Sequence, residues 1–62
     1  MKHDFLQLAI KGKGMTMSEV AAFLNLSEAT FILHLSGVLR FSEPHRQRLS
    51  QFFGYSEAVL FS

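Results

Sequence analysis

The side chains that could do acid–base, nucleophilic or metal chemistry are few in this sequence and widely spaced. None of the three histidines, His3, His34 and His45, has a second histidine four residues away, the spacing that puts two metal ligands on one helix face. Together with Asp4 and the glutamates they form no recognisable set of nucleophile, base and orienting group. We therefore expect no catalytic site, no metal site, no cofactor and no small-molecule substrate.

Length and composition also argue against an enzyme. The chain has 62 residues and forms one domain at most. A domain of this size buries only about 60% of its unfolded surface, which leaves no room for both a core and a deep catalytic cavity. Apolar residues make up 48% of the chain and charged residues only 18%. Part of the apolar surface is therefore expected to face another protein chain.

Hydropathy and charge indicate a cytoplasmic protein with weak electrostatic attraction to nucleic acid. Polar residues interrupt every apolar run before about 18 residues, the length of a membrane span, and residues 1–4 do not open a signal peptide. We therefore expect no membrane partner. The net charge is +1 and the pI about 8.2, whereas dedicated nucleic-acid-binding domains often exceed a pI of about 9.

Helix-capping residues divide the chain into short helical segments. Thr16 and Glu19 have the spacing of a capping box, and Ser27, Ser42 and Ser56 each precede a segment with helical periodicity. The predicted helices span residues 4–11, 17–25, 28–36, 43–53 and 57–61. The sequence thus predicts an all-α fold, a compact five-helix bundle in a single domain over residues 1–62. The second and third segments, joined by a short turn, predict a helix-turn-helix.

The order and spacing of these signals resemble the Cro and lambda-type repressor family. The similarity extends from Phe5 to Phe61, and each matching motif is common by itself, so the joint spacing carries the resemblance. The matching motifs are Gly14-Met15-Thr16, Glu19-Val20-Ala21, Leu26-Ser27, Thr30-Phe31, Gly37, Phe53-Gly54-Tyr55-Ser56 and Leu60-Phe61. The resemblance implies a small phage-type gene regulator whose third helix, over residues 28–36, is the recognition helix.

Three positions depart from the family pattern within the expected core. Many family members pair an Arg in the first helix with a Glu near the end of the third, and those positions here hold Ile10 and Leu35. Since packed apolar residues often replace a buried ion pair at no cost in stability, we expect Ile10 and Leu35 to touch in the core. His34 falls where the family often has a packed aromatic or aliphatic residue. We expect a half-buried ring with one hydrogen bond.

The expected recognition helix lacks the side chains that read bases. The resemblance places Glu28, Ala29 and Leu33 towards the bases, with Ile32 at the edge. Direct readout commonly uses Arg or Lys for guanine and Asn or Gln for adenine, and residues 26–39 contain none of these four types. Glu28 could still accept a hydrogen bond from the amino group of cytosine, and Ala29 could contact a thymine methyl group. Any sequence readout would therefore depend on few contacts.

The expected phosphate contacts are also reduced. The family commonly has a Gln at the start of the second helix, where this chain has Met17. The loop after the third helix has one basic side chain, Arg40, and an acidic side chain, Glu43, follows it. Arg46 and Arg48 lie in the fourth helical segment, where a solvated helix face is the favoured interpretation over a contact with DNA.

The third helix and the loop after it instead carry an apolar strip. The predicted members of the strip are Ala29, Ile32, Leu33, Val38, Leu39 and Phe41. Monomers rarely expose contiguous apolar patches above a few hundred Å², so the strip is expected to meet a partner helix or the same surface of a second copy. In an alternative arrangement some of these side chains, Val38 and Leu39 among them, turn inward and fill the small core.

Two functions remain open on these grounds. The favoured one is a gene-regulatory protein that binds a repressor or a related helix-turn-helix protein through the strip, as an antirepressor or modulator. The alternative is a Cro-like repressor that binds operator DNA as a homodimer. Its DNA contacts would come from Met17, Glu28, Ala29, Leu33 and Arg40.

Overall fold

Five helices make up the computed structural model, which describes residues 2–61. They are α1 (Asp4–Gly12), α2 (Met17–Phe23), α3 (Glu28–Ser36), α4 (Glu43–Phe53) and α5 (Glu57–Leu60). No strand occurs within this range, and the three principal extents are nearly equal at 24, 23 and 21 Å. The all-α architecture expected from the sequence is confirmed. No helix among these residues has the length and apolar character needed to cross a membrane.

Side-chain caps start four of the five helices. At α2 the Glu19 amide donates to Thr16 Oγ1 at 3.1 Å, and the Thr16 amide donates to Glu19 Oε1 at 2.8 Å, which completes the capping box. Ser27, Ser42 and Ser56 each accept a hydrogen bond from the amide three residues later. These caps satisfy amides that have no partner within their own helix, so the helix starts are set by local sequence.

Helix α2 ends two residues before its predicted end at residue 25. Asn25 adopts a left-handed backbone with φ of 59°, a conformation that asparagine tolerates better than most residues. The Leu26 amide then donates to the Ala21 carbonyl at 2.8 Å and closes the end of the helix. Smaller differences occur elsewhere, since α1 extends to Gly12 and α5 ends at Leu60.

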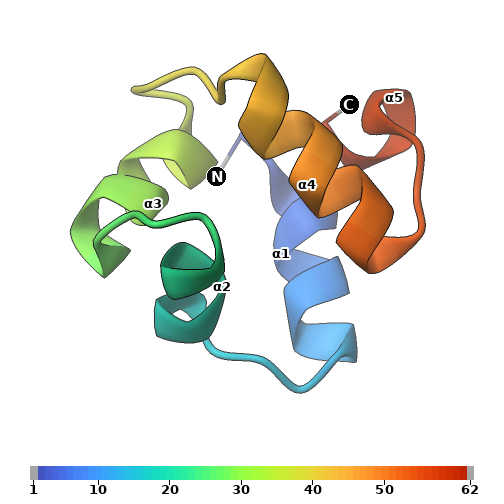
Figure 1. Ribbon diagram of the computed structural model, residues 1–62, viewed down its shortest axis with the longest axis horizontal. Coiled ribbons are helices and arrows are strands. Elements are labelled where there is room, and N and C mark those ends of the chain that lie inside the picture. The colour runs from blue at the N-terminus through green and yellow to red at the C-terminus, as the bar shows by residue number, and fades with distance from the viewer. Residues whose placement is uncertain (1, 62) are drawn as a thin grey trace.

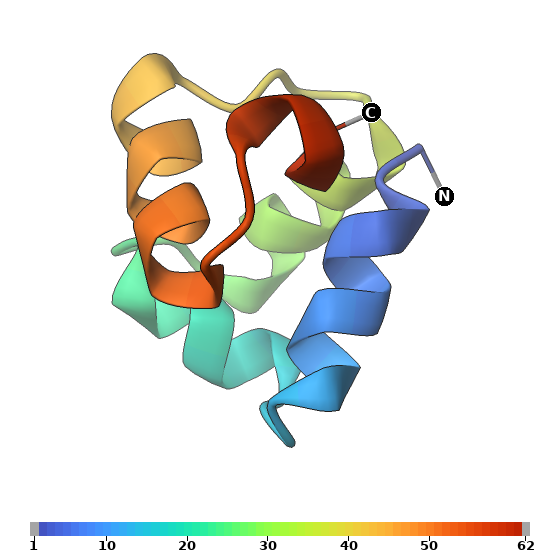
Figure 2. The ribbon, with the colours of Figure 1, turned by 90° about the vertical axis from the view of Figure 1, so that its right-hand side faces the viewer.

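Helices α2 and α3 lie on the left of Figure 1, and α4 and α5 lie on the right, with α1 between the two groups. Helix α1 packs against α3 and α5, while α2 packs against α3 and α4 against α5. Figure 2 shows α5 lying between α4 and α1. Each short helix therefore covers a part of one common core.

The core contains side chains from every helix and from the loop between α3 and α4. Its buried members are Leu6, Ile10, Val20, Ala21, Leu24, Phe31, Leu35, Phe41, Leu49, Phe53 and Leu60. Ile10 and Leu35, the pair expected to replace a buried ion pair, are both fully buried in this cluster. Met15 and Met17 pack against its edge and are partly exposed.

Phe41 belongs to this core and not to the exposed strip in which the sequence placed it. Only 6% of its surface is exposed. Its ring stacks on His34 at a centroid distance of 4.8 Å and lies 5.2 Å from Phe61 and 5.5 Å from His3. The prediction was wrong because the Phe41 ring packs between rings of the N-terminal segment, of α3 and of the residue that follows α5.

The prediction for His34 also needs correction. Its ring is 7% exposed and therefore buried, not half-buried. Its Nδ1 atom has no hydrogen-bond partner among residues 2–61, and the ring is instead held by stacking on Phe41. His34 thus behaves mainly as a flat packing residue.

Candidate functional site

Five exposed apolar side chains on α3 and the following loop form what we call the apolar strip. The strip consists of Ala29, Ile32, Leu33, Val38 and Leu39. The exposed fractions of the last four are 36%, 42%, 70% and 40%. The alternative in which Val38 and Leu39 turn inward is therefore not the one observed.

The backbone at the end of α3 holds the two halves of the strip together. Ala29, Ile32 and Leu33 have the i, i+3, i+4 spacing that places side chains on one helix face. The amides of Val38 and Leu39 both donate to the Leu33 carbonyl, at 3.1 and 3.2 Å. The loop residues are thereby fixed against the last turn of α3, and the strip continues from the helix onto the loop.

Gly37 makes this turn possible and brings the N-terminal segment close to it. It has a φ of 88°, which favours glycine because it has no Cβ. A Cβ added there would lie 2.8 Å from Cδ of Lys2. The His3 amide donates to the Leu35 carbonyl at 3.2 Å. Residues 2 and 3 therefore lie directly against the C-terminal end of α3.

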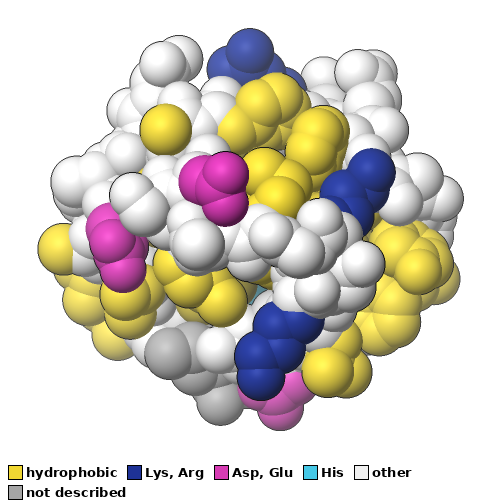
Figure 3. Space-filling model, turned by 90° about the horizontal axis from the view of Figure 1, so that it is seen from below, with side chains coloured by type: hydrophobic (Ala, Val, Ile, Leu, Met, Phe, Trp, Pro, Cys, Tyr) yellow, Lys and Arg dark blue, Asp and Glu magenta, His cyan; other side chains and the backbone are white. Residues whose placement is uncertain are grey.

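The residues proposed for DNA contact come from α2, from α3 and from the loop after α3. Glu28 begins α3 while Arg40 follows its end, and a nine-residue helix is about 13 Å long. Met17 is partly buried against the core. The face below α2 and the end of α1, seen in Figure 3, carries Lys and Arg side chains at separate places rather than in a continuous basic stripe. The structure does not gather these residues into one basic surface.

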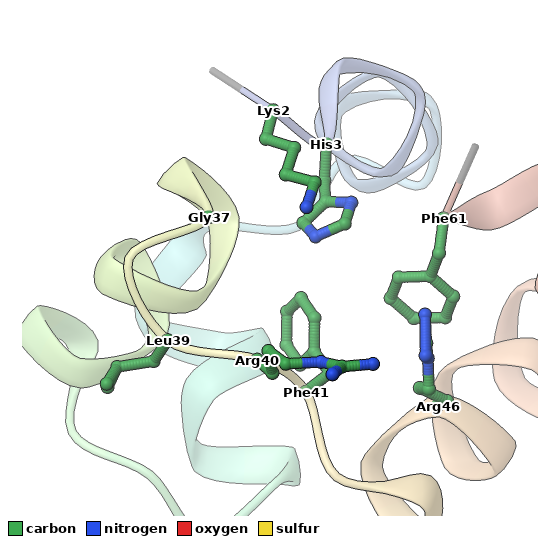
Figure 4. A pocket seen from close by; sticks show the side chains of 8 residues that line it. All are labelled: Lys2, His3, Gly37, Leu39, Arg40, Phe41, Arg46 and Phe61. Atoms are coloured by element: carbon green, nitrogen blue, oxygen red, sulfur yellow. The ribbon is translucent and has the colours of Figure 1, made fainter.

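A pocket of about 280 Å³ lies beside the apolar strip (Figure 4). It is lined by Lys2, His3, Gly37, Leu39, Arg40, Phe41, Arg46 and Phe61. Among the residues that the structure describes, the lining therefore includes three cationic side chains and no acidic one. We call it the cationic pocket. Leu39 belongs both to this pocket and to the apolar strip, so the two features are continuous.

Arg46 is more constrained than the solvated helix face expected from the sequence. Its guanidinium carbon lies 5.1 Å from the centroid of the Phe61 ring, a cation–π arrangement, and the side chain is half-buried. Arg48 is exposed, as expected, although its guanidinium lies 5.3 Å from the Phe23 ring. The two arginines of α4 thus stack on different rings, and only Arg46 lines the pocket.

Burial and neighbouring cations act on two of the histidines. Desolvation by burial lowers the pKa of His3, and the charges of Lys2 and Arg46 lower that pKa further. Burial also lowers the pKa of His45, with additional contributions from His34 and Arg48. Both rings therefore favour the neutral form more strongly in the folded protein than they would in water.

These pKa shifts predict a loss of stability on acidification. An unfolded imidazole titrates near about pH 6.5, so below that pH the unfolded chain binds more protons than the folded chain. The stabilising contribution is complete above about pH 6.5 and decreases as the pH falls towards the lowered folded-state pKa values. The thermal unfolding midpoint is expected to fall between pH 7.5 and pH 5.5, and His45→Gln should reduce this fall. A midpoint that stays level or rises on acidification would contradict the assignment.

The described residues offer no candidate metal centre in which three His, Cys, Asp or Glu side chains come together. Two histidine rings, those of His34 and His45, make an edge-on contact with 5.8 Å between their centroids. This contact forms part of the aromatic packing around Phe41.

Comparison with known protein families, with curated proteins and with solved structures returns no match. The function is therefore inferred from the chain's own surface. The apolar strip can be predicted from the sequence, whereas the cationic pocket cannot. Lys2, Arg40, Arg46 and Phe61 come from four separate segments, and no short-range spacing in the sequence links them.

Proposed function

We propose that this chain is a helix-turn-helix gene regulator that acts by docking on another regulator, a repressor or a related helix-turn-helix protein. The observation that carries the proposal is the apolar strip on α3, at the place where a DNA reader would present polar side chains. Docking there would let the chain act as an antirepressor or modulator.

Support for a helix-turn-helix comes from α2 and α3. They are short helices of seven and nine residues that pack against each other, and a turn containing the left-handed Asn25 joins them. Two short packed helices with such a turn are the elements of this motif. In the proposal α3 keeps the position of a recognition helix and presents an apolar face.

A protein partner suits the chemistry of this face better than DNA does. Ile32, Leu33, Val38 and Leu39 expose aliphatic surface, which gains free energy when another apolar surface removes it from water. Base edges and phosphates are polar, and burying an aliphatic group against them leaves their hydrogen bonds unmatched. An amphipathic helix or a matching apolar face of a related regulator would cover the strip.

The proposal predicts that Leu33→Ser prevents formation of a heteromer. The substitution removes an apolar side chain near the middle of the strip, and anchors of this kind can contribute about 2 kcal/mol or more to binding. Light scattering after size-exclusion chromatography would measure the molar mass of the chain alone and mixed with a repressor encoded next to its gene. Leu8→Ser is the matched control, since Leu8 is 65% exposed on α1, outside the strip.

The same mixtures distinguish the proposal from DNA binding. A heteromer that persists in moderate salt and abolishes operator binding by the repressor supports the proposal. A homodimer that ignores the repressor and binds the operator in a strongly salt-dependent manner would favour the Cro-like function, because phosphate contacts release counterions. Equal loss of the heteromer in Leu33→Ser and Leu8→Ser would remove the strip as the docking site.

A further inference from the structure

We propose that the cationic pocket binds a small phosphate monoester, whose dianionic phosphate is held by Lys2, Arg40 and Arg46. This site is separate from protein docking on the apolar strip. The proposal rests on the cationic side chains of the described lining, a preorganised arginine, a buried histidine and aromatic walls.

The lining of the pocket is strongly cationic. Lys2, Arg40 and Arg46 face one cavity whose lining contains no acidic side chain among residues 2–61, and within that range the structure records no ion pair between any of the three and a carboxylate. Three cations around a small hollow repel one another, and an anion between them removes that repulsion. A phosphate monoester carries about 1.5 to 2 negative charges at pH 7, so it compensates this site more fully than a carboxylate would.

The two arginines of the pocket are placed where both can reach one anion. The Arg46 guanidinium is stacked over Phe61 at 5.1 Å, which limits its freedom before any ligand arrives. Figure 4 shows the Arg40 side chain extended across Phe41 towards Arg46 and Phe61. A guanidinium presents parallel N–H donors that match two oxygens of one phosphate. Two such groups on one side of a cavity are suited to a tetrahedral oxyanion.

His3 is a buried lining residue of the pocket. The side chain is 7% exposed, and its Nδ1 atom has no hydrogen-bond partner among the residues that the structure describes. Its ring packs edge-on against Phe61 and tilted against Phe41. Lys2 from the N-terminal segment and Arg46 from α4 both act against its protonation. A bound dianion would oppose these two charges and raise the His3 pKa.

The size and walls of the pocket indicate the rest of the ligand. A volume of about 280 Å³ lies just below the usual range of ligand pockets, about 300–1,000 Å³. Phe41, Phe61 and Leu39 contribute apolar surface beside the cations. A phosphate attached to a single small ring fits both features, and phenyl phosphate is therefore a suitable probe.

The test is an NMR titration of the intact chain with phenyl phosphate at low ionic strength. Saturable shifts are expected at the amides of Gly37, Arg40 and Phe61, together with a higher pKa for the His3 ring. Inorganic phosphate should produce the same pattern more weakly, and phenol should produce none. Absence of saturable shifts at these residues with phenyl phosphate would overturn the proposal.

Two matched arginine variants locate the site. Arg46→Gln should weaken phenyl phosphate binding by at least about tenfold, since a charge-assisted hydrogen bond to an anion contributes about 1.5–3 kcal/mol and each 1.4 kcal/mol is a factor of about ten. Arg48→Gln removes the same charge from the same helix, also from above a phenylalanine ring, and should leave affinity unchanged. Arg40→Gln alters an exposed side chain and gives the same answer if Arg46→Gln perturbs folding. Equal effects of the Arg46 and Arg48 substitutions would show that net charge alone attracts the probe.

Two further arms separate this site from other functions of the surface. Leu33→Ser should bind phenyl phosphate normally, so failure of protein docking and failure of the pocket are independent results. A 12-base-pair DNA duplex presents phosphate diesters. If the duplex shifts the pocket residues while phenyl phosphate does not, the proposed monoester site is wrong and the cations serve a nucleic-acid backbone.

Discussion

Replacing Leu35 by Glu is expected to remove a large part of the protein's stability. Leu35 is fully buried, and Ile10, which is fully buried in the same core cluster, provides no countercharge. An unpaired charge in such a position costs about 3–5 kcal/mol, compared with a total stability of about 5–15 kcal/mol for natural domains. Urea unfolding followed by circular dichroism would measure the difference in unfolding free energy.

A control variant and a compensating second substitution test whether the loss of stability comes from the buried charge at position 35. Leu33→Glu introduces the same charge on the same helix at a 42% exposed position and should change stability by no more than about 0.5 kcal/mol. Adding Ile10→Arg to Leu35→Glu should recover part of the loss, because a buried ion requires its partner. Equal effects of the two Glu substitutions would contradict the core assignment, and a double variant without recovery would show that positions 10 and 35 do not meet.

The sequence predicted the starts of the helices well because their causes are local. The cap at Thr16 depends on Glu19, and the cap at Ser27 depends on an amide three residues away. Such interactions can be read from spacing alone. The end of α2 was predicted two residues late because a residue that can end a helix need not be its last residue. Asn25 adopts the left-handed conformation after the helix has already ended at Phe23.

The role of Phe41 could not be predicted in the same way. The loop sequence from residue 38 to residue 41 contains three apolar residues and has no helical period that would say which of them points inward. Its inward direction depends on contacts with His3 and Phe61, which are 38 and 20 residues away in sequence. The cationic pocket has the same origin, since Lys2 and Arg46 line one pocket only after the N-terminal segment has packed against the end of α3.

The strip and the pocket share a single structural support. The turn at Gly37 directs Val38 and Leu39 outward while Phe41 turns inward to become the floor of the pocket. Exposed aliphatic surface and a charged hollow are thereby placed side by side by one short loop. A change in that loop is expected to affect both features, whereas a change on the α3 face alone should affect only the strip.

Phe41→Ala is expected to be the most damaging substitution in this loop. The ring is 6% exposed and packs against His3, Phe31 and His34. Truncating a buried phenylalanine costs about 3–5 kcal/mol through lost burial and the cavity left behind. For a domain of this size the thermal midpoint should fall by about 12 °C or more. Differential scanning calorimetry would measure both the midpoint and the enthalpy.

The matched control is Val38→Ala, three residues earlier in the same loop. Val38 is 70% exposed, so its truncation should change stability by no more than about 0.5 kcal/mol while weakening any partner that covers the strip. The pair of variants therefore separates support of the fold from contact with a partner. If Phe41→Ala kept its midpoint and lost only partner binding, Phe41 would belong to the docking surface together with Val38 and Leu39.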